Sequence, residues 1–395
     1  MEKWILDVKQ RATTGKAPIG SGRSANADKI SFGDLVFVPA QLAKKPVDYF
    51  KEKISSETII GKSSKYPLKL KTPILIAAMS FGALSKEAKI ALAKGATLSG
   101  TAANTGEGGM LPDERKEAKI LIAQYSTGRF GIDEKYLKSA DAIEIKLGQG
   151  AKPGQGGLLP AHKVTEEISK VRKVPMGEDV HSPAYHADIK DIGDLKKKVD
   201  WIRELTGGKP IIIKLGAGDV EKDVELAVKA NPDAIAIDGM AGGTGAAPEI
   251  MLNDFGIPTL AAVVRARKTL DKLNAKQELI IGGGLNTGAD IAKALALGAD
   301  AVFIGFPMLT AMGCIYCKQC YKDTCPFGVT TQDPGLRKKF PKNAAEGVAN
   351  YINACTEEVK MAAGACGYNN IHKLNKKDLK ALDKTISEIA DVPLV

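Results

Sequence analysis

The feature that most constrains the fold is a regular alternation, from about residue 73 onward, of short apolar runs with longer stretches of helical character. Several runs, such as PIIIKLGAG at 210–218, are continuous and rich in Ile and Val. That composition is typical of strands buried on both faces of a parallel sheet. The predicted strands lie at 73–80, 99–106, 142–150, 178–183, 210–218, 234–243, 278–284 and 301–307.

The stretches between these runs have the ends expected of helices. The stretch 85–98 (SKEAKIALAKGATL) opens with Ser85 in an S-x-E pattern, and the stretch 287–300 opens with Thr287. Both hydroxyl side chains can cap a helix N-terminus. Eight strands alternating with helices predict an α/β fold, a (β/α)8 TIM barrel, with an open doubly wound sheet as the alternative.

The remaining chain lies on either side of this repeat. Residues 1–72 are predicted to form an N-terminal extension packed on the barrel, with a strand-like segment at 34–40 (DLVFVPA). Residues 73–395 form the barrel domain, including a cysteine loop at 313–334 and C-terminal helices at about 344–361 and 376–390.

The net charge of +10 raises the possibility of nucleic-acid binding, but the Lys and Arg residues are scattered and only 5% of residues are aromatic. Attraction for an acidic redox partner or an anionic substrate explains the charge better, as does an ordinary solvated surface. No signal-peptide core lies in residues 1–11 and no apolar run is long enough to span a membrane, so we expect a cytoplasmic protein.

Four of the six cysteines lie in GCIYCKQCYKDTCPFG. Cys314, Cys317, Cys320 and Cys325 have the spacing C-x2-C-x2-C-x4-C, with a proline after the last. Thiolates this close together favour an iron–sulfur cluster, and zinc is the alternative. The two other cysteines, in the helical tail, are predicted to be buried thiols.

Glycine-rich turns and lysines follow several predicted strands. The turns at 238–248, 282–290 and 304–309 offer backbone N–H groups, and the second also offers a helix N-terminus, for a phosphorylated cofactor. A dinucleotide fingerprint is the competing interpretation of 282–284, but its G-x-G-x-x-G pattern is incomplete. Lys146 and Lys214 end apolar strands, where a lysine needs either a negative partner, such as a bound anion, or a route to solvent.

Together with the cysteine loop, seven of the strand-end segments resemble, in order, those of the FMN-binding synthase domain of the glutamate synthase large subunit, in its compact stand-alone form. These segments are AAMSFGALS, NTGEGG, QYSTGRFG, KLGQGAKPGQGG, HSPAYHADI, DGMAGGTGA and GGGLNTGADIAKALALGAD. Within the loop, the C-x5-C-x4-C pattern of Cys314, Cys320 and Cys325 is similar to the loop that holds a [3Fe-4S] cluster beside FMN in that family. Cys317 departs from the pattern and could make the cluster [4Fe-4S].

The resemblance implies a role for each matching residue. Gln149, Lys152 and Arg172 would bind the two carboxylates of 2-oxoglutarate or its imine, and Glu107 would lie near the flavin in proton or ammonia handling. Gln149, Lys152 and Glu107 would be the catalytic set. FMN would contact Met79, Ser80, Gln124, Lys146, Lys214, Gly242, Gly243, Thr244, Gly283 and Gly284. His162, His181 and His186 would be either structural or proton donors, and HSPAYHADI differs from the family's usual string at the substrate-side loop.

The implied reaction is that of an oxidoreductase acting on CH–NH2 donors. Ammonia and 2-oxoglutarate would form 2-iminoglutarate, which FMN would reduce to L-glutamate with electrons that arrive through the cluster. The chain shows no glutaminase or nicotinamide-binding segment, so a separate glutaminase subunit and a ferredoxin or reductase subunit are the expected partners. The alternatives are a related barrel with another substrate, such as an amine giving N-methylglutamate, and a non-catalytic electron-transfer subunit.

Overall fold

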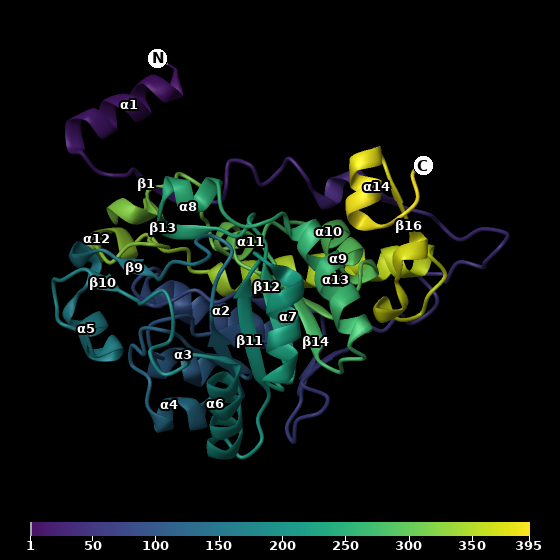
Figure 1. Ribbon diagram of the computed structural model, residues 1–395, viewed down its shortest axis with the longest axis horizontal. Helices are drawn as coiled ribbons and strands as arrows, with labels where there is room; N and C mark the ends of the chain where they lie inside the picture. Colours follow the sequence, from purple (N-terminus) through teal and green to yellow (C-terminus); the bar gives the residue numbers. More distant parts are fainter. Residues whose placement is uncertain (1) are drawn as a thin grey trace.

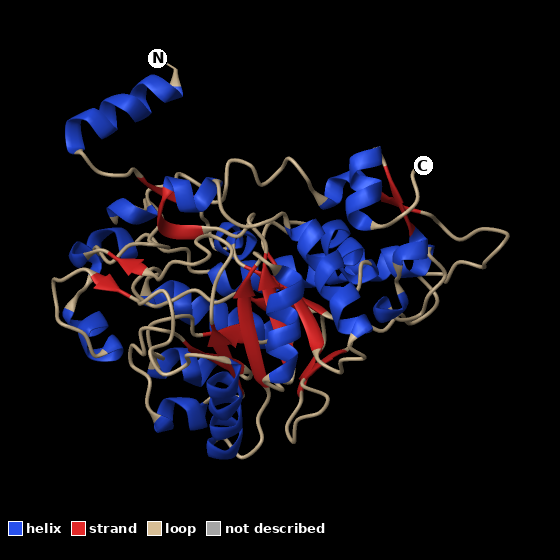
Figure 2. Ribbon diagram, in the orientation of Figure 1, coloured by secondary structure: helices blue, strands red, loops and turns tan. Residues whose placement is uncertain are grey.

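The computed structural model describes residues 2–395, and its centre is an eight-stranded parallel barrel surrounded by helices (Figures 1 and 2). The strands are hydrogen-bonded in the order β5-β15-β14-β12-β11-β8-β7-β6. A backbone hydrogen bond of 3.1 Å from Ile76 N–H to Ala102 O brings the two ends of this order together. The barrel is therefore nearly closed, and the open-sheet alternative is wrong. Its strands are β5 (Ile74–Ile76), β6 (Ala103–Asn104), β7 (Leu121–Tyr125), β8 (Ala142–Lys146), β11 (Ile211–Gly216), β12 (Ala234–Asp238), β14 (Glu278–Gly282) and β15 (Ala301–Ile304).

One predicted barrel strand is wrong, and one barrel strand was not predicted. The segment 178–183 contributes only β10 (Val180–His181), which pairs antiparallel with β9 (Leu158–Leu159) outside the barrel. Its charged and exposed residues do not suit a position between the barrel interior and the surrounding helices. The missing barrel strand is β7, whose sequence LIAQY is buried at every position. The apolar run of β7 was the signal in the sequence. It was not assigned as a strand because it follows β6 closely.

Helices of the βα units cover the outside of the barrel. Ser85 caps α2 as predicted, because its side chain accepts a hydrogen bond from Ala88 N–H at 3.2 Å. Thr287 and Asp290 form a capping box at the start of α10. The covering helices are α2 (Lys86–Ser99), α3 (Pro112–Glu117), α4 (Glu134–Ser139), α6 (Ile192–Leu205), α7 (Val220–Lys229), α9 (Thr259–Lys272), α10 (Gly288–Ala296) and α13 (Ala344–Ala365).

The barrel interior is filled by side chains from alternate strand positions, among them Leu75, Ile122, Ile212 and Phe303. The hairpin of β3 (Thr58–Ile60) and β4 (Leu68–Leu70) packs its own apolar side chains against this interior core. It comes from the N-terminal extension, which therefore closes the amino end of the barrel. The strands' other neighbours, such as Ile235 and Ile281, pack outward against the helices.

Other parts of the extension pair with segments far along the chain. The helix α1 (Lys3–Thr14) projects from the body (Figure 1) and leads to β1 (Ile19–Gly22), which pairs antiparallel with β13 (Thr244–Pro248). After the 3-10 turn η1 (Phe32–Asp34), β2 (Leu35–Phe37) pairs with β16 (Leu379–Ala381). The strand expected in 34–40 is confirmed. The predicted helix at 376–390 is wrong in its first half, because residues 379–381 complete a sheet with β2.

The loops at the carboxyl ends of the barrel strands carry the remaining elements. After β8 come β9, η2 (Ala161–Lys163), α5 (Glu166–Arg172) and β10. After β12 come β13 and α8 (Glu249–Asn253), and after β15 come α11 (Phe306–Ala311), η3 (Cys320–Lys322) and α12 (Pro334–Arg337). The tail holds η4 (Ile371–Lys373), η5 (Lys376–Asp378) and α14 (Lys384–Ala390). Among residues 2–395, no helix combines the length and the apolar character needed to cross a bilayer.

A buried ion pair fixes the first two of these loops. Lys89 on α2 and Glu114 on α3 are each 1% exposed, and Lys89 Nζ lies 2.9 Å from Glu114 Oε1. The same ammonium group donates to the carbonyl oxygens of Met79, Asn104 and Thr105 at 2.6, 2.9 and 2.9 Å. One cation thus ties the loop after β5 to the loop after β6.

We predict that Lys89→Met lowers the free energy of unfolding by about 3–5 kcal/mol, since Glu114 would remain buried without its partner. Urea denaturation followed by circular dichroism measures the change. The matched control is Lys138→Met, which breaks an exposed pair of 2.9 Å with Glu134 and should cost at most about 1 kcal/mol. Equal losses in the two variants would contradict the assignment.

Candidate active site

One cavity of about 230 Å³ opens at the carboxyl ends of the barrel strands, where TIM-barrel enzymes place their chemistry. Its wall brings together every non-cysteine residue that the sequence singled out for flavin or substrate. They are Met79, Ser80, Glu107, Gln124, Lys146, Gln149, Lys152, Arg172, Lys214, Gly242, Gly243, Thr244, Gly283 and Gly284. Residues from positions 79 to 284 therefore share one site.

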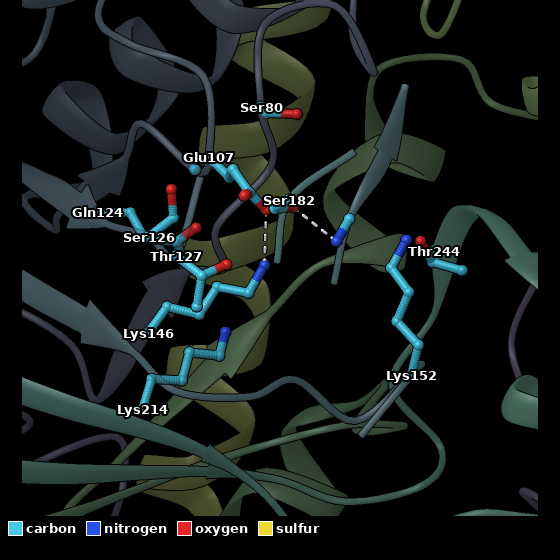
Figure 3. A network of polar contacts seen from close by, with 12 residues as sticks. Ser80, Glu107, Gln124, Ser126, Thr127, Lys146, Lys152, Ser182, Lys214 and Thr244 are labelled. Carbon is cyan, nitrogen blue, oxygen red and sulfur yellow. Dashed lines mark hydrogen bonds and ion pairs between the residues drawn. The ribbon is translucent and has the colours of Figure 1, made fainter. Parts of the chain in front are cut away.

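Lys146 at the end of β8 meets Glu107 from the loop after β6 (Figure 3). Lys146 Nζ donates to Glu107 Oε2 at 2.8 Å, and both side chains are about 10% exposed. Burial alone would raise the pKa of Glu107, but the charge and hydrogen bond of Lys146, a hydrogen bond from Ser182 and the charge of Arg172 together lower that pKa to about 2. Glu107 is therefore a carboxylate at neutral pH, with no stored proton to donate. Its buried Oε1 has no hydrogen-bond partner in residues 2–395.

Lys214 at the end of β11 also has an acidic partner. Its Nζ lies 3.0 Å from Asp238 Oδ2, and it sits 5.2 Å from the centre of the Phe303 ring. Burial opposes the charged form, but Asp238 and Glu144 outweigh it and raise the pKa of Lys214. The sequence predicted that a bound anion could neutralise Lys146 and Lys214. In the structure, carboxylates of the chain itself already do so.

Lys152 and Arg172 differ from these paired lysines. Lys152 is 4% exposed, and its Nζ donates to the carbonyl oxygen of Ala246 at 2.8 Å. Arg172, also 4% exposed, donates to Phe81 O and to Ser80 Oγ, each at 3.0 Å. No carboxylate among residues 2–395 lies within 4.0 Å of either cation. The cavity therefore holds two buried positive charges without an acidic partner.

Burial, reinforced by the charge of Lys146 and opposed by Glu107, lowers the pKa of Lys152 to about 8. Burial likewise lowers the pKa of Arg172 to about 10, again against the charge of Glu107. Figure 3 shows Lys152 beside Thr244, across the cavity from Lys146 and Lys214. A ligand with two negative groups would relieve both unpaired cations.

The glycine-rich turns owe part of their composition to packing between loops. Gly283 has a φ of +105°, and a Cβ there would lie 2.8 Å from the carbonyl oxygen of Gly239, while a Cβ on Gly243 would overlap the Phe306 ring. The predicted anion site at the N-terminus of α10 is wrong. Asp290 accepts the N–H groups of Asn286 and Thr287, and Glu358 accepts that of Gly288 at 2.7 Å.

The cysteine loop lies next to this cavity. All four of its cysteines, together with Phe306, Tyr316 and Phe327, line a second, smaller cavity. Cys320 borders both cavities. In residues 2–395, no three His, Cys, Asp or Glu side chains are arranged closely enough to chelate a single metal ion. Burial would raise the pKa of Cys325, but hydrogen bonds from Thr330, Phe327 and Val329 outweigh it and lower that pKa.

Of the three histidines that the sequence singled out, His186 is firmly held in the interior. Its Nε2–H donates to Lys146 O at 2.8 Å, its Nδ1 accepts from Arg129 Nη1, and its ring stacks on Tyr125. Burial lowers the pKa of His186 to about 4, so it is neutral and structural, and it positions the end of β8. His162 contacts the Tyr321 carbonyl at 3.1 Å, and His181 is exposed.

Several lining residues were missed from the sequence. Arg23 comes from the N-terminal extension, Lys163 and Ser182 from the long loop after β8, and Asp238 from the end of β12. Asp238 had a signal, because it ends an apolar strand as Lys214 does. Arg23, Lys163 and Ser182 lie in irregular segments, where no periodicity marks them.

A family model described as a conserved region in glutamate synthase matches residues 33–369. The chain belongs to the glutamate synthase family. The resemblance in its strand-end segments is thereby confirmed, and this glutamate synthase family member is an oxidoreductase.

Relatives of known name agree with this membership. A glutamate synthase large subunit-like protein of Rhizobium meliloti (strain 1021) is 40% identical over 412 residues, covering 99% of this chain and 93% of that protein. The archaeal glutamate synthase (NADPH) of Archaeoglobus fulgidus is 38% identical, covering 96% of this chain and 79% of its own length. The glutamate synthase (NADPH) large chain of Bacillus subtilis (strain 168) is 37% identical over 75% of this chain, which spans 20% of that larger protein.

Solved structures with the same fold include flavoenzymes. A mandelate oxidase variant carrying a monooxide FMN adduct has a TM-score of 0.58 at 16% identity, covering 92% of this chain and 94% of its own. A flavocytochrome b2 variant with bound sulfite has a TM-score of 0.59 at 16% identity, covering 91% and 80%. At this identity, the likeness establishes the family member's barrel fold.

We predict that Lys152→Met stabilises the ligand-free protein at pH 7 by about 1–3 kcal/mol, because a buried cation is removed. The folded-state pKa of about 8 is below the ordinary 10.5. The destabilisation is therefore complete below pH 8 and disappears as the pH rises toward 10.5. Thermal unfolding at pH 7 and pH 10 measures the gain, with Lys170→Met as the exposed control. A gain that is equal at both pH values would contradict this origin.

Proposed function

We propose that this enzyme makes L-glutamate by reducing 2-iminoglutarate, formed from 2-oxoglutarate and ammonia, with FMN and an iron–sulfur cluster as its redox groups. One observation carries the substrate assignment. The cavity pairs three of its buried cations, Lys146, Lys163 and Lys214, with carboxylates and leaves two others, Lys152 and Arg172, for a ligand. A dicarboxylate supplies the two missing charges. The names of the relatives support the same reaction.

The residues around the cavity fit FMN. The paired lysines Lys146 and Lys214, the amide of Gln124 and the backbone at Met79–Ser80 would surround the ring, and the turns at 242–244 and 283–284 would hold the ribityl phosphate end. Gln124 is already oriented, since its Nε2 donates to the buried Glu144 at 2.6 Å. When bound, FMN supplies the hydride for the imine carbon. The protein's part is to orient the substrate and to exclude water.

On the substrate side, Lys152 and Arg172 would each bind one carboxylate, and Gln149 would hydrogen-bond beside them. Glu107 would bind ammonia or ammonium. Its pKa of about 2 keeps it anionic, and its Oε1 is a buried acceptor without a donor. In this arrangement Glu107 accepts a hydrogen bond from the nitrogen that attacks the keto carbon. Of the two roles that the resemblance implies for Glu107, ammonia handling is the one that we propose.

The cysteine loop suits a cluster better than a single metal ion. Its four cysteines line the smaller cavity, and no three His, Cys, Asp or Glu side chains of residues 2–395 are arranged to chelate one metal ion. Cys314, Cys320 and Cys325 would hold a [3Fe-4S] cluster, with [4Fe-4S] as the form in which Cys317 also binds. Cys320 would be the ligand nearest to the flavin, because it lines both cavities.

Electrons would come from a ferredoxin or from a separate reductase subunit. The surface of the cysteine loop favours a negatively charged donor protein. Ile315 is 61% exposed there, and the exposed lysines Lys318, Lys322, Lys338 and Lys339 lie in the same loop and its continuation. Such a patch attracts acidic proteins. Ammonia would come from solution or from a separate glutaminase subunit.

The test of this function is reoxidation of the photoreduced flavin under anaerobic conditions. Addition of 2-oxoglutarate with ammonia should reoxidise the flavin and yield glutamate, and either compound alone should not. Reoxidation with methylamine in place of ammonia would identify an N-methylglutamate-forming enzyme. No reoxidation with either amine would reject the proposal.

We predict that Lys152→Met abolishes this 2-oxoglutarate-dependent reoxidation while FMN absorbance and flavin content stay unchanged, since Lys152 would contact the substrate only. In the wild type, affinity for 2-oxoglutarate should be highest below pH 8 and should fall above it, because the anion needs the ammonium form of Lys152. Lys170→Met should behave as wild type. Flavin loss in Lys152→Met would show that Lys152 binds the cofactor.

We also predict that Cys317→Ser keeps the iron content and the EPR signal of the oxidised cluster, whereas Cys320→Ser loses both. The reason is that a three-iron cluster needs only Cys314, Cys320 and Cys325. Iron and sulfide analysis with EPR of the anaerobic protein is the measurement. Conversion of the signal in Cys317→Ser would identify Cys317 as a fourth ligand, and stoichiometric zinc without iron would reject the cluster.

A further inference from the structure

Lys163 occupies an unusual position between the two cavities. It ends the 3-10 turn η2 in the long loop after β8, and it is 2% exposed. Its Nζ donates to the carbonyl oxygens of Ala83 at 3.2 Å, Cys320 at 3.3 Å and Thr330 at 2.8 Å. Its Nζ atom therefore connects three loops: the loop after β5, the long loop after β8 and the cysteine loop.

The contacts of Lys163 suit an ammonium group. Three carbonyl oxygens surround Nζ, and Asp323 Oδ1 lies 3.8 Å away. A neutral amine has two N–H donors, whereas an ammonium group has three. Lys163 also lines the larger cavity, whose proposed ligands are anions. The positive charge is thus buried at the backbone of the one cysteine that borders both cavities.

We propose that Lys163 is a positioning residue for electron transfer, which holds the Cys320 segment against the flavin cavity and raises the reduction potential of the cluster. This inference rests on the proposed function, because it requires a cluster in the cysteine loop. Reduction adds one negative charge to the cluster. A buried cation beside a ligand stabilises that charge, and in the interior the interaction is only weakly screened.

The loop has enough other anchors to survive the loss of this charge. Gln332 Nε2 donates to the carbonyl oxygens of Gly82 and Leu84 at 3.0 and 2.9 Å, and its backbone N–H donates to Asp323 at 2.8 Å. Tyr321 N–H donates to Ser21 of the N-terminal extension at 3.2 Å. These contacts do not involve Lys163, and they hold both sides of Cys320. Removing the charge should therefore change the potential more than the fold of the loop.

Redox titration of the cluster, followed by EPR on the flavin-loaded holoenzyme, tests the inference without any substrate. Lys163→Met and Lys163→Gln should both shift the potential to more negative values, the second while it retains hydrogen-bond donors. Asp323→Asn should shift the potential the other way, because it removes a negative charge and keeps an oxygen for Gln332. Lys318→Met, an exposed lysine between two of the cysteines, is the control and should shift it least.

The outcomes separate the possibilities. Opposite shifts in the Lys163 and Asp323 variants, at wild-type iron content, support the inference. If the Lys163 variants hold iron and shift no more than Lys318→Met, the inference is overturned and the proposed function stands. If both Lys163 variants lose iron, the Asp323→Asn variant decides. A shift of its cluster potential to more positive values supports the inference, and an unchanged potential means that Lys163 has only a structural role. An iron-free wild-type protein would overturn the cluster and this inference together.

Discussion

The burial of cations at the carboxyl ends of the barrel strands is the constraint on which the rest of the site depends. A buried lysine is tolerated only where oxygens surround it. Lys89 finds Glu114 and three carbonyl groups, Lys146 finds Glu107, and Lys214 finds Asp238. Each of these ion pairs joins two different βα units of the barrel. The contacts that neutralise these buried cations are therefore also the contacts that assemble the cavity.

Two buried cations of the cavity, both in the long loop after β8, have no carboxylate of residues 2–395 within 4.0 Å. Lys152 contacts one carbonyl oxygen, and Arg172 contacts a hydroxyl and a carbonyl group of the loop after β5. Their lowered pKa values express the energetic cost of burial without a counter-ion. A folded chain keeps such a cost where a ligand removes it. The same charges thus weaken the ligand-free fold and supply affinity for a dianion.

Much of the fold could be predicted from sequence because buried parallel strands are continuously apolar. Seven of the eight barrel strands were predicted, most of them from such apolar runs, and the errors have physical reasons. The segment at 178–183 does contain a strand, β10, but that strand is short and its His181 is exposed. It pairs with β9 in a hairpin outside the barrel. The local sequence around residues 379–381 predicts a helix. The segment is a strand because it pairs with β2, which is distant in the sequence. Pairing between remote segments cannot be obtained from local pattern.

In the site too, some residues could be found from local sequence pattern, whereas their contacts depend on the folded structure. Lys146 and Lys214 could be found in the sequence because each lies near the end of an apolar strand, and Lys152 because its segment resembles that of the family. The pairing of Lys146 with Glu107 and of Lys214 with Asp238 follows instead from the closure of the barrel. Lys163 had no signal, since its importance lies in contacts with Ala83, Cys320 and Thr330. These hydrogen bonds place the long loop after β8 against the cysteine loop. Lys163 therefore joins the wall of the larger cavity to the backbone of Cys320.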